Sequence, residues 1–244
     1  IRARRCRDRR PGSTDSRRPM LTLYVGNKNY SSWSLRGWLA AKLSGAPFRE
    51  VGVQLVGRGR NPANRGFSPS GFVPALHEGD TVVWDSLAIA EYLAERHPGM
   101  WPADPVARAW ARSICAEMHS SFPALRNEMT MCVRERLDVR PWSPELAADI
   151  ARVEEIWTES RRRHGRGGAY LCGAPSIADA FYAPVAFRFQ TYLVAPAGEA
   201  GSYLSALLAH PFMREWERDA VAGTIVIEPD EPRVVYRDKL AGRA

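Results

Sequence analysis

Three serines, Ser31, Ser32 and Ser34, stand where a β-prone segment gives way to a pattern typical of a helix. A hydroxyl at the start of a helix can donate a hydrogen bond to an anion, and the positive end of the helix adds to the attraction. A thiolate needs such stabilisation, because a free thiol has a pKa near ~8.5 and stays mostly protonated at neutral pH. The serines could therefore bind and ionise a thiol, although taken alone they favour a capping role, and the thiol-site interpretation depends on the later motifs.

A single serine is sufficient for this chemistry. Lowering a thiol pKa by roughly two units takes about 2.7 kcal/mol of stabilisation of the thiolate relative to the thiol. One hydrogen bond to a charged group supplies ~1.5–3 kcal/mol, and a helix N-terminus adds ~0.3–1 kcal/mol. Neither a metal nor a histidine base is required. The plainer alternative is that the serines only cap the helix and shape the turn before it.

Two further segments accompany the serines. Val73-Pro74 opens a predicted strand, and Asp85-Ser86 starts a second predicted helix. A serine at the positive end of a helix can hold a carboxylate, and an aspartate beside it can accept a hydrogen bond from an amino group. The alternatives are an ordinary trans proline at an edge strand and simple capping of the helix.

Together these segments resemble the amino-terminal half of the glutathione transferases. The resemblance is closest to the serine-type classes, whose zeta members carry Ser-Ser-Cys-Ser-x-Arg where this chain has Ser31-Ser32-Trp33-Ser34-Leu35-Arg36. It extends more weakly over residues 21–220. In that motif the thiol-activating serine lies five residues before the arginine, which makes Ser31 the first candidate for the catalytic hydroxyl and Ser32 the second.

The resemblance implies glutathione as co-substrate and attack of its thiolate on a small hydrophobic electrophile. A cis bond between Val73 and Pro74 would let the Val73 backbone pair with bound glutathione in the manner of an added strand. Ser86 would hold the γ-glutamyl carboxylate, and Asp85 would accept from the α-amino group. A homodimer is expected by resemblance only.

Three side chains near the motif have other expected roles. Some glutathione transferases use a tyrosine near the end of the first strand. Here Tyr24 lies within the strand pattern and is expected in the core, whereas Tyr30 is expected to line the site. Arg36 is expected to support the first helix through a buried ion pair rather than to contact substrate.

The order of elements predicts a thioredoxin-like domain over residues 20–97, followed by an all-helical domain over residues 105–222. Ser34 is the predicted cap of the first helix. The other predicted elements of the first domain are strands at 21–25 and 48–55, a loop at 57–70, a hairpin of 75–78 with 81–84, and a helix at 86–96.

The second domain is predicted to contain helices near 105–137, 145–163, 177–191, 202–209 and 212–221. Pro123 and Pro184 must bend or break the helices that contain them. Ser176 and Asp179 form a predicted capping box with a structural role. The periodic pattern is lost after Gly223, so residues 223–244 are expected to pack loosely over the body.

The net charge of +7 is concentrated at one end of the chain. Residues 1–20 carry eight arginines against two aspartates, which accounts for +6 and leaves the remainder close to neutral. We expect residues 1–19 to be disordered, because they contain too few apolar side chains to form a core. Translated sequence upstream of a start at Met20 is the preferred interpretation, with a basic interaction tail as the rival. Nucleic-acid binding is therefore not favoured.

Composition also argues against several other classes. The four cysteines form no CxxC pair and the five histidines are scattered, which predicts no metal site and favours a reducing, cytoplasmic setting. No apolar run approaches the ~20 residues of a membrane span. The chain is 45% hydrophobic and 25% charged, as is usual for a globular protein.

Rival functions remain open. The helical domain is expected to cover the electrophile, with candidates Trp110, Met118, Phe122 and Arg126. A zeta-like cis-trans isomerase of maleyl-type diacids is the nearest alternative, although Trp33 replaces the zeta cysteine and only Arg188 lies near the place of a carboxylate-binding arginine. A deglutathionylating enzyme would need a cysteine at Ser31 or Ser32. A non-catalytic glutathione-binding protein is the alternative from another class.

Overall fold

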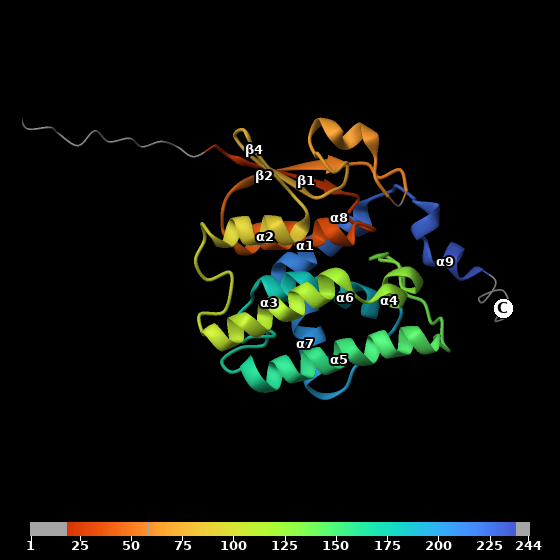
Figure 1. The fold of residues 1–244 in the computed structure, drawn as a ribbon. Helices are drawn as coiled ribbons and strands as arrows, with labels where there is room; N and C mark the ends of the chain where they lie inside the picture. Colours follow the sequence, from red (N-terminus) through yellow and green to blue (C-terminus); the bar gives the residue numbers. More distant parts are fainter. Residues whose placement is uncertain (1–18, 58, 238–244) are drawn as a thin grey trace, which may run out of the picture.

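The computed structural model, which describes residues 19–57 and 59–237, places a four-stranded sheet at one end of the molecule (Figure 1). The strand order is β2-β1-β3-β4, with β1 parallel to β2 and the pairs β1–β3 and β3–β4 antiparallel. The basic extension predicted over residues 1–19 lies, apart from Pro19, outside the described residues. The strands are β1 (Leu21–Gly26), β2 (Phe48–Val53), β3 (Ala75–Glu78) and β4 (Thr81–Trp84).

Two helices cover one face of this sheet, α1 (Ser32–Leu43) and α2 (Ser86–Ala94). The short 3₁₀ helix η1 (Pro62–Gly66) lies on the other side of the sheet in Figure 1. Alternating apolar residues of β1 turn toward the helices, and Leu23 is fully buried beside its register partner Leu76. The order βαβ, loop, ββα confirms the predicted thioredoxin-like fold.

Below the sheet and its two helices the chain is helical, which confirms the predicted all-α second half (Figure 1). Helix α6 lies at the centre of this half and packs against α1, α3 and α7. The helices are α3 (Pro105–Ser120), α4 (Pro123–Glu128), α5 (Pro144–His164), α6 (Ile177–Thr191), α7 (Gly198–Ala209) and α8 (Pro211–Ala222).

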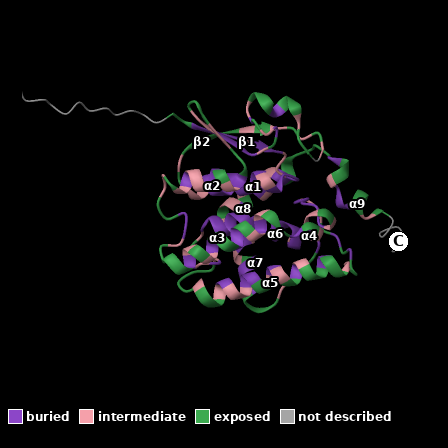
Figure 2. Ribbon diagram, viewed as in Figure 1, coloured by how far each residue is buried: buried purple, intermediate pink, exposed green. Residues whose placement is uncertain are grey.

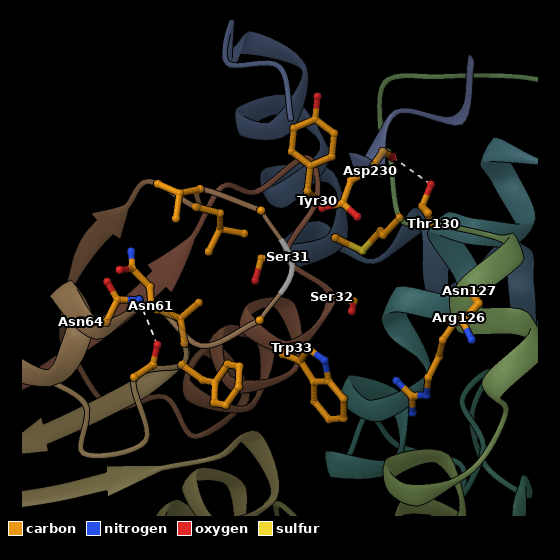
Figure 3. Close-up of a pocket in the computed structure, with 18 of the residues that line it drawn as sticks. Tyr30, Ser31, Ser32, Trp33, Asn61, Asn64, Arg126, Asn127, Thr130 and Asp230 are labelled. Atoms are coloured by element: carbon orange, nitrogen blue, oxygen red, sulfur yellow. Dashed lines mark hydrogen bonds between the residues drawn. The ribbon is translucent and has the colours of Figure 1, made fainter. Parts of the chain in front are cut away.

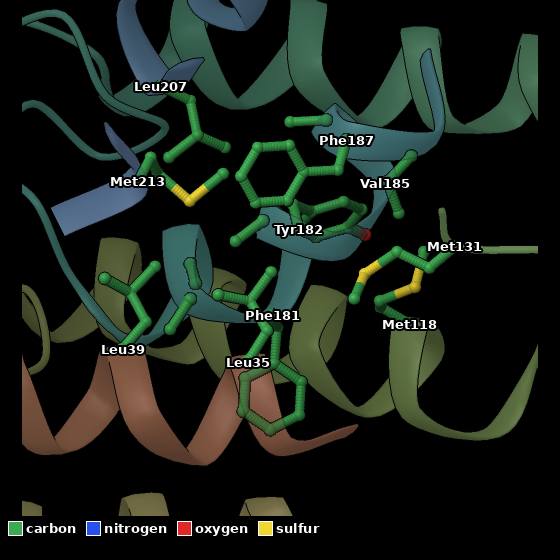
Figure 4. Close-up of a cluster of buried hydrophobic side chains, with 14 of the residues drawn as sticks. Leu35, Leu39, Met118, Met131, Phe181, Tyr182, Val185, Phe187, Leu207 and Met213 are labelled. Carbon is green, nitrogen blue, oxygen red and sulfur yellow. The ribbon is translucent and has the colours of Figure 1, made fainter. Parts of the chain in front are cut away.

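Helix α6 is buried along almost its whole length, as Figure 2 shows. Its aromatic and branched side chains pack against α1, at the bottom of the view in Figure 4, and against α3, α7 and α8. Phe181 lies beside Leu35 of α1, so one apolar core joins the thioredoxin-like half to the helical half. This shared core fixes the start of α1 relative to the helical half, which is what the site requires.

Helix bounds differ from the prediction at several places, and α7 begins at Gly198 instead of near residue 202. Helix α1 begins at Ser32 with Ser31 as its N-cap, because the Ser34 hydroxyl instead accepts the Gly26 N–H at 2.9 Å. The helix predicted over residues 105–137 ends at Ser120, where Phe122 takes a left-handed conformation with φ of 66° before Pro123. Helix α6, in contrast, runs through Pro184 without a break.

The prediction of a loosely packed tail is wrong for the described residues 223–237. These residues form η2 (Glu228–Asp230) and the short helix α9 (Pro232–Val235). Ile227 and Glu231 are buried against the body, and the Tyr236 hydroxyl donates to the Glu128 carbonyl at 2.7 Å. The segment ends beside α4 at the edge of the molecule (Figure 1). Among the described helices, none has the length and apolar character that a membrane crossing requires.

Candidate active site

A tight loop joins β1 to α1 and presents the three serines. The N–H groups of Tyr30 and Ser31 both donate to the Asn27 carbonyl, at 3.0 and 2.9 Å. Gly26 is needed at the end of β1, since a Cβ there would lie 3.0 Å from the Ser31 hydroxyl oxygen. The loop therefore holds Ser31 against the first turn of α1.

Ser31 is both a helix cap and a cavity residue. Its Oγ accepts the Ser34 N–H at 3.4 Å and donates to Ser34 Oγ at 2.8 Å. The same residue lines a cavity of about 290 Å³, together with Ser32 (Figure 3). Ser31 thus caps the helix and lines the cavity at the same time, and its hydroxyl stands at the positive end of a twelve-residue helix.

The cavity lies between the two halves of the molecule. One wall comes from the thioredoxin-like half and includes Val73 and the loop around Leu55, while Arg126 and Arg188 belong to the opposite wall. Figure 3 shows Ser31 and Ser32 facing the space between these walls, with Asp230 of the C-terminal segment at the rim. A cleft between two packed units is a common place for a small-molecule site.

The structure separates the predicted binding residues into two groups. Val73 lines the cavity, and the Val73–Pro74 peptide bond is cis. Pro74 itself packs against α1, where a Cβ on Gly37 would lie 2.9 Å from the proline ring. Asp85 and Ser86 are not among the residues that line the cavity. The predicted glutathione site is thus only partly assembled around the open space.

Asp85 and Ser86 instead occupy the start of α2. Asp85 has a φ of 75° and caps the helix by accepting the Leu87 N–H at 2.7 Å. The Ser86 side chain is 1% exposed, and its Oγ has no hydrogen-bond partner among the described residues. A buried hydroxyl without a partner is costly, which marks Ser86 as a group that a ligand would satisfy.

His119 of α3 faces this corner from the helical half. Its Nε2 lies 3.5 Å from an Asp85 carboxylate oxygen, and its ring meets the Trp33 ring edge-on at 5.2 Å between centroids. Burial lowers the pKa of His119, Asp85 acts in the opposite direction, and the charges of Arg36 and Arg126 lower it further. His119 is therefore a neutral imidazole at pH 7.

Arg36 does not form the predicted ion pair. Its guanidinium is buried with the residue 1% exposed, and Nη2 donates to the Met118 carbonyl at 3.4 Å. The Nε and Nη1 groups lack partners among the described residues. The group lies 4.6 Å from the Trp33 ring and 5.1 Å from the Phe181 ring, so aromatic faces replace the expected carboxylate. Burial lowers the Arg36 pKa, and the Arg126 and Arg188 charges add to this.

The wall of the helical half differs from the prediction. Of the four predicted residues, only Arg126 lines the cavity. Met118 and Phe122 are buried in the core, and the Trp110 indole donates to Ser160 Oγ at 2.8 Å. The interruption at Phe122 accounts for only part of the error, because Trp110 and Met118 lie before the turn, in α3. On this side of the cavity, the lining residues missed by the prediction are Asn127, Thr130, Met131 and Asp230.

Both cavity arginines are held by backbone carbonyls. Arg188 Nε donates to the Met129 carbonyl at 2.6 Å, and Arg126 Nε donates to the Ser121 carbonyl at 2.9 Å. Burial lowers the pKa of Arg126, but a guanidinium stays charged at neutral pH. Two fixed cations opposite the start of α1 make the cavity favourable for anions.

Tyr30 lines the cavity as predicted, but its hydroxyl is used elsewhere. The Tyr30 O–H donates to the Glu231 carboxylate of the C-terminal segment and points away from Ser31 (Figure 3). Burial and this hydrogen bond raise the pKa of Tyr30 to about 12. Tyr30 is therefore engaged as a protonated donor to Glu231. Tyr24, predicted in the core, is half-buried and stacks on the Phe67 ring with 4.3 Å between centroids.

Among the described residues, no group of three or more His, Cys, Asp and Glu side chains is arranged to hold a metal ion. The cysteines described are free thiols, and burial raises the pKa of both Cys115 and Cys132. The serines at the start of α1 and the arginines opposite them can donate hydrogen bonds to an anionic ligand and stabilise its charge.

Comparisons with known proteins agree with this geometry. Residues 30–96 match the family described as glutathione S-transferase, N-terminal domain. A glutathione transferase homolog from Burkholderia GL BGR1, solved with bound glutathione, has a TM-score of 0.61 and 25% identity, covering 84% of this chain and 99% of that chain.

Two curated relatives carry different names. A maleylacetoacetate isomerase from Rattus norvegicus is 28% identical over 168 residues, which cover 65% of this chain and 77% of the relative. A stringent starvation protein A homolog from Pasteurella multocida (strain Pm70) is 26% identical over 206 residues, covering 83% of this chain and 91% of the relative. The two names do not indicate a single activity.

Proposed function

This chain belongs to the glutathione S-transferase family, and we propose that it binds glutathione in the cavity and uses Ser31 to stabilise the thiolate for attack on an electrophilic carbon. The observation that carries the proposal is the position of the Ser31 hydroxyl. It lies at the positive end of α1 and lines the cavity together with Val73. Ser32, on the same turn, is a second donor.

Ser34 sets the direction of the Ser31 hydrogen bond. Ser34 Oγ accepts the Gly26 N–H at 2.9 Å and lies 2.8 Å from Ser31 Oγ. When Ser34 donates its own proton to Ser31, the Ser31 proton is left for the sulfur. Binding of a thiolate therefore requires one hydroxyl pair to reverse its donor and acceptor, with no movement of the backbone.

The remaining site residues orient the peptide. The Val73 backbone lies at the cavity wall and can pair with the cysteinyl part of glutathione. Ser86 Oγ, buried without a partner, is suited to the γ-glutamyl carboxylate. Reaching it requires a rearrangement at the Trp33–His119 contact, because the open cavity does not extend to Ser86.

The chemical step is a nucleophilic attack. The thiol proton leaves to solvent, and the sulfur electron pair forms a bond to the electrophilic carbon. In a substitution the leaving group departs with its bonding electrons, and in an addition the resulting carbanion takes a proton from water. The contribution of this chain is to hold the sulfur as an anion and to exclude part of the solvent around it.

A glutathione-dependent isomerase of maleyl-type diacids is a second candidate. It is favoured by Arg126 and Arg188, two guanidiniums in the wall opposite the serines, which suit a dicarboxylate. The named activity of the isomerase relative points the same way. In that reaction the thiolate would add to the double bond, the carbon–carbon bond would rotate, and elimination would restore the thiol.

The two candidates are separated by their dependence on Arg188. Initial rates are measured for wild type, Ser31→Ala and Arg188→Met, with a neutral aromatic electrophile and with a cis diacid. A conjugating enzyme loses neutral-substrate turnover in Ser31→Ala and keeps it in Arg188→Met. An isomerase loses diacid turnover in both variants. Calorimetry that detects no glutathione binding would refute both, and binding without either activity would leave a non-catalytic binding protein.

A homodimer, expected by resemblance, and a cytoplasmic location, favoured by the cysteine pattern, are part of the same proposal. Sedimentation of the purified full chain tests the dimer directly.

A further inference from the structure

The chain after α8 forms a strap over the loop that presents Ser31. We use "strap" for residues 223–236, which include η2 and α9. The strap passes from the end of α8 to the side of α4 (Figure 1). Asp230 lies at the cavity rim, and its carbonyl accepts the Thr130 hydroxyl at 2.8 Å. The strap is therefore part of the cavity wall.

A small apolar contact fastens the strap to the serine loop. Ile227 is 6% exposed and packs with Tyr30 and Cys132, and Leu55 covers the same group. The Ile227 N–H also donates to the Tyr30 hydroxyl at 3.3 Å. Tyr30, the residue immediately before Ser31, is thus enclosed by the strap on its outer side.

A buried charged group completes the attachment. Glu231 accepts hydrogen bonds from the Tyr30 hydroxyl and from Arg134 Nη2, the latter at 2.6 Å. Arg134 also reaches back along the strap, because its Nη1 donates to the Gly223 carbonyl at 3.2 Å. The Glu231 side chain is 11% exposed, so its charge depends on these partners rather than on water.

Tyr30 is consequently restrained at both ends. Its backbone N–H is fixed on the Asn27 carbonyl at 3.0 Å, and its hydroxyl is fixed on Glu231 some two hundred residues later in the chain. Ser31 follows directly and shares the Asn27 carbonyl. A displacement of the Tyr30 side chain should therefore shift the Ser31 backbone and change the direction of the Ser31 hydroxyl.

We propose that Glu231 is a positioning residue for Ser31, acting through Tyr30, so that the strap holds the hydroxyl in the geometry that stabilises a bound thiolate. For its catalytic consequence this inference rests on the proposed function. The ordering of the loop at residues 27–32 by the strap does not depend on the proposed function.

The test compares Glu231→Ala, Glu231→Gln and Tyr30→Phe with Arg233→Ala. Arg233 is also on the strap, but it pairs with Glu135 at 2.9 Å in an exposed position, so its loss is expected to have little effect. Glu231→Gln keeps an acceptor for Tyr30 and loses the charge that pairs with Arg134. It should therefore fall between wild type and Glu231→Ala.

Two readouts are taken on the full-length chain. Amide hydrogen exchange in the absence of glutathione should rise about 10-fold at Tyr30 and Ser31 in Glu231→Ala and Tyr30→Phe, and not in Arg233→Ala. The kcat should fall ~10-fold in the same two variants with KM for glutathione nearly unchanged, because small misplacement of a catalytic group costs rate more than binding. The pKa of the bound thiol should rise with the loss of kcat.

The double variant Glu231→Ala with Tyr30→Phe should be no slower than Glu231→Ala alone, because both changes break one connection. The proposal is overturned if folded Glu231→Ala and Tyr30→Phe match Arg233→Ala in exchange at Tyr30 and Ser31. It is also overturned if exchange rises while the thiol pKa and kcat of an active enzyme do not change. If wild type fails to ionise glutathione, the proposed function fails, and the exchange arm still decides whether Glu231 orders the loop.

Discussion

Helices α1 and α6 both begin with a serine N-cap, yet the two serines have different surroundings. Ser176 at the start of α6 is buried, and its N–H and hydroxyl both donate to Asp179, at 2.8 and 3.0 Å. Ser31 at the start of α1 lines a cavity, and its hydroxyl donates to Ser34 Oγ and accepts the Ser34 N–H within the same turn. The residue type and helix position are the same and both residues are buried, at 6% and 3% exposed, so the difference lies in the cavity beside Ser31 and in the hydrogen-bond partners.

This difference shows when a capping serine is available for chemistry. The Ser176 hydroxyl is committed to a carboxylate, which is a strong acceptor inside a dry core. The Ser31 hydroxyl has a partner that can act as donor or acceptor, so its proton can be redirected without loss of the cap. We therefore expect changes at α6 to affect folding and changes at α1 to affect ligand chemistry.

The largest effect is expected at Asp179. Its carboxylate accepts from the N–H groups of Leu171 and Ser176 in addition to the Ser176 hydroxyl. Asp179→Ala leaves these buried donors unpaired and should lower the free energy of unfolding by about 3 kcal/mol or more. Chemical denaturation measures this value. A loss below that of Ser176→Ala would contradict a structural role for the carboxylate.

Ser31→Ala should have the largest effect on activity. Loss of the hydroxyl removes a hydrogen bond to a charged sulfur, worth about 2–3 kcal/mol, and kcat should fall about 100-fold. The free energy of unfolding should fall by only about 1 kcal/mol, because the lost cap bond is long at 3.4 Å. Ser32→Ala is the matched control, and a larger rate loss there would transfer the catalytic role to Ser32.

The sequence was sufficient to predict the elements of the thioredoxin-like half, which form one wall of the cavity. Alternation in β1, the Gly79-Asp80 turn and the serine run are local signals, and they placed the sheet, the hairpin and the start of the site. The bounds of α1 depended on whether Ser34 or Ser31 capped the helix. Ser31 is the cap because the Ser34 hydroxyl accepts a hydrogen bond from the Gly26 N–H, eight residues earlier, and the local pattern does not reveal this contact.

The other side of the cavity could not be predicted from local pattern. Glu231 meets Tyr30 across two hundred residues, in a tail with no helical period. Arg188 lies in a helix that is buried almost throughout, where nothing local distinguishes a cavity residue from a core one. The irregular turn at Phe122 separates α3 from α4, the short helix that carries Arg126 at the cavity.

Ser176→Ala removes the capping hydroxyl of α6 and is the counterpart of Ser31→Ala in α1. Loss of its hydroxyl removes one of the hydrogen bonds to Asp179 and should lower the free energy of unfolding by about 1 kcal/mol. Glutathione turnover at a temperature where both proteins are folded should match wild type. A rate loss as large as that of Ser31→Ala would show that the two caps do not differ in function.

The smallest effect concerns pH. Because the native environment lowers the pKa of His119 below its ordinary 6.5, the unfolded chain binds this proton more tightly. The contribution of neutral His119 to stability is present above pH 6.5 and is lost as pH falls through the native pKa. Asp179 acts with the opposite sign, since burial raises its pKa to about 6 and its contribution is lost as pH rises through that value.

The difference between wild type and His119→Gln isolates the histidine. Denaturation midpoints taken from pH 7.5 to pH 5 should show wild type losing stability faster than the variant as pH falls. Parallel curves would show that the imidazole, which faces Asp85, Arg36 and Arg126, does not titrate differently in the native state.

The central claim is that the Ser31 hydroxyl at the start of α1 keeps a bound thiol ionised. Ultraviolet titration of the thiolate of bound glutathione, in wild type, Ser31→Ala and Ser176→Ala, measures this directly. We predict a thiol pKa about two units below that of free glutathione in wild type and Ser176→Ala, and a return toward the free value in Ser31→Ala. An unshifted wild-type titration, or an equal shift in all three proteins, would contradict the claim.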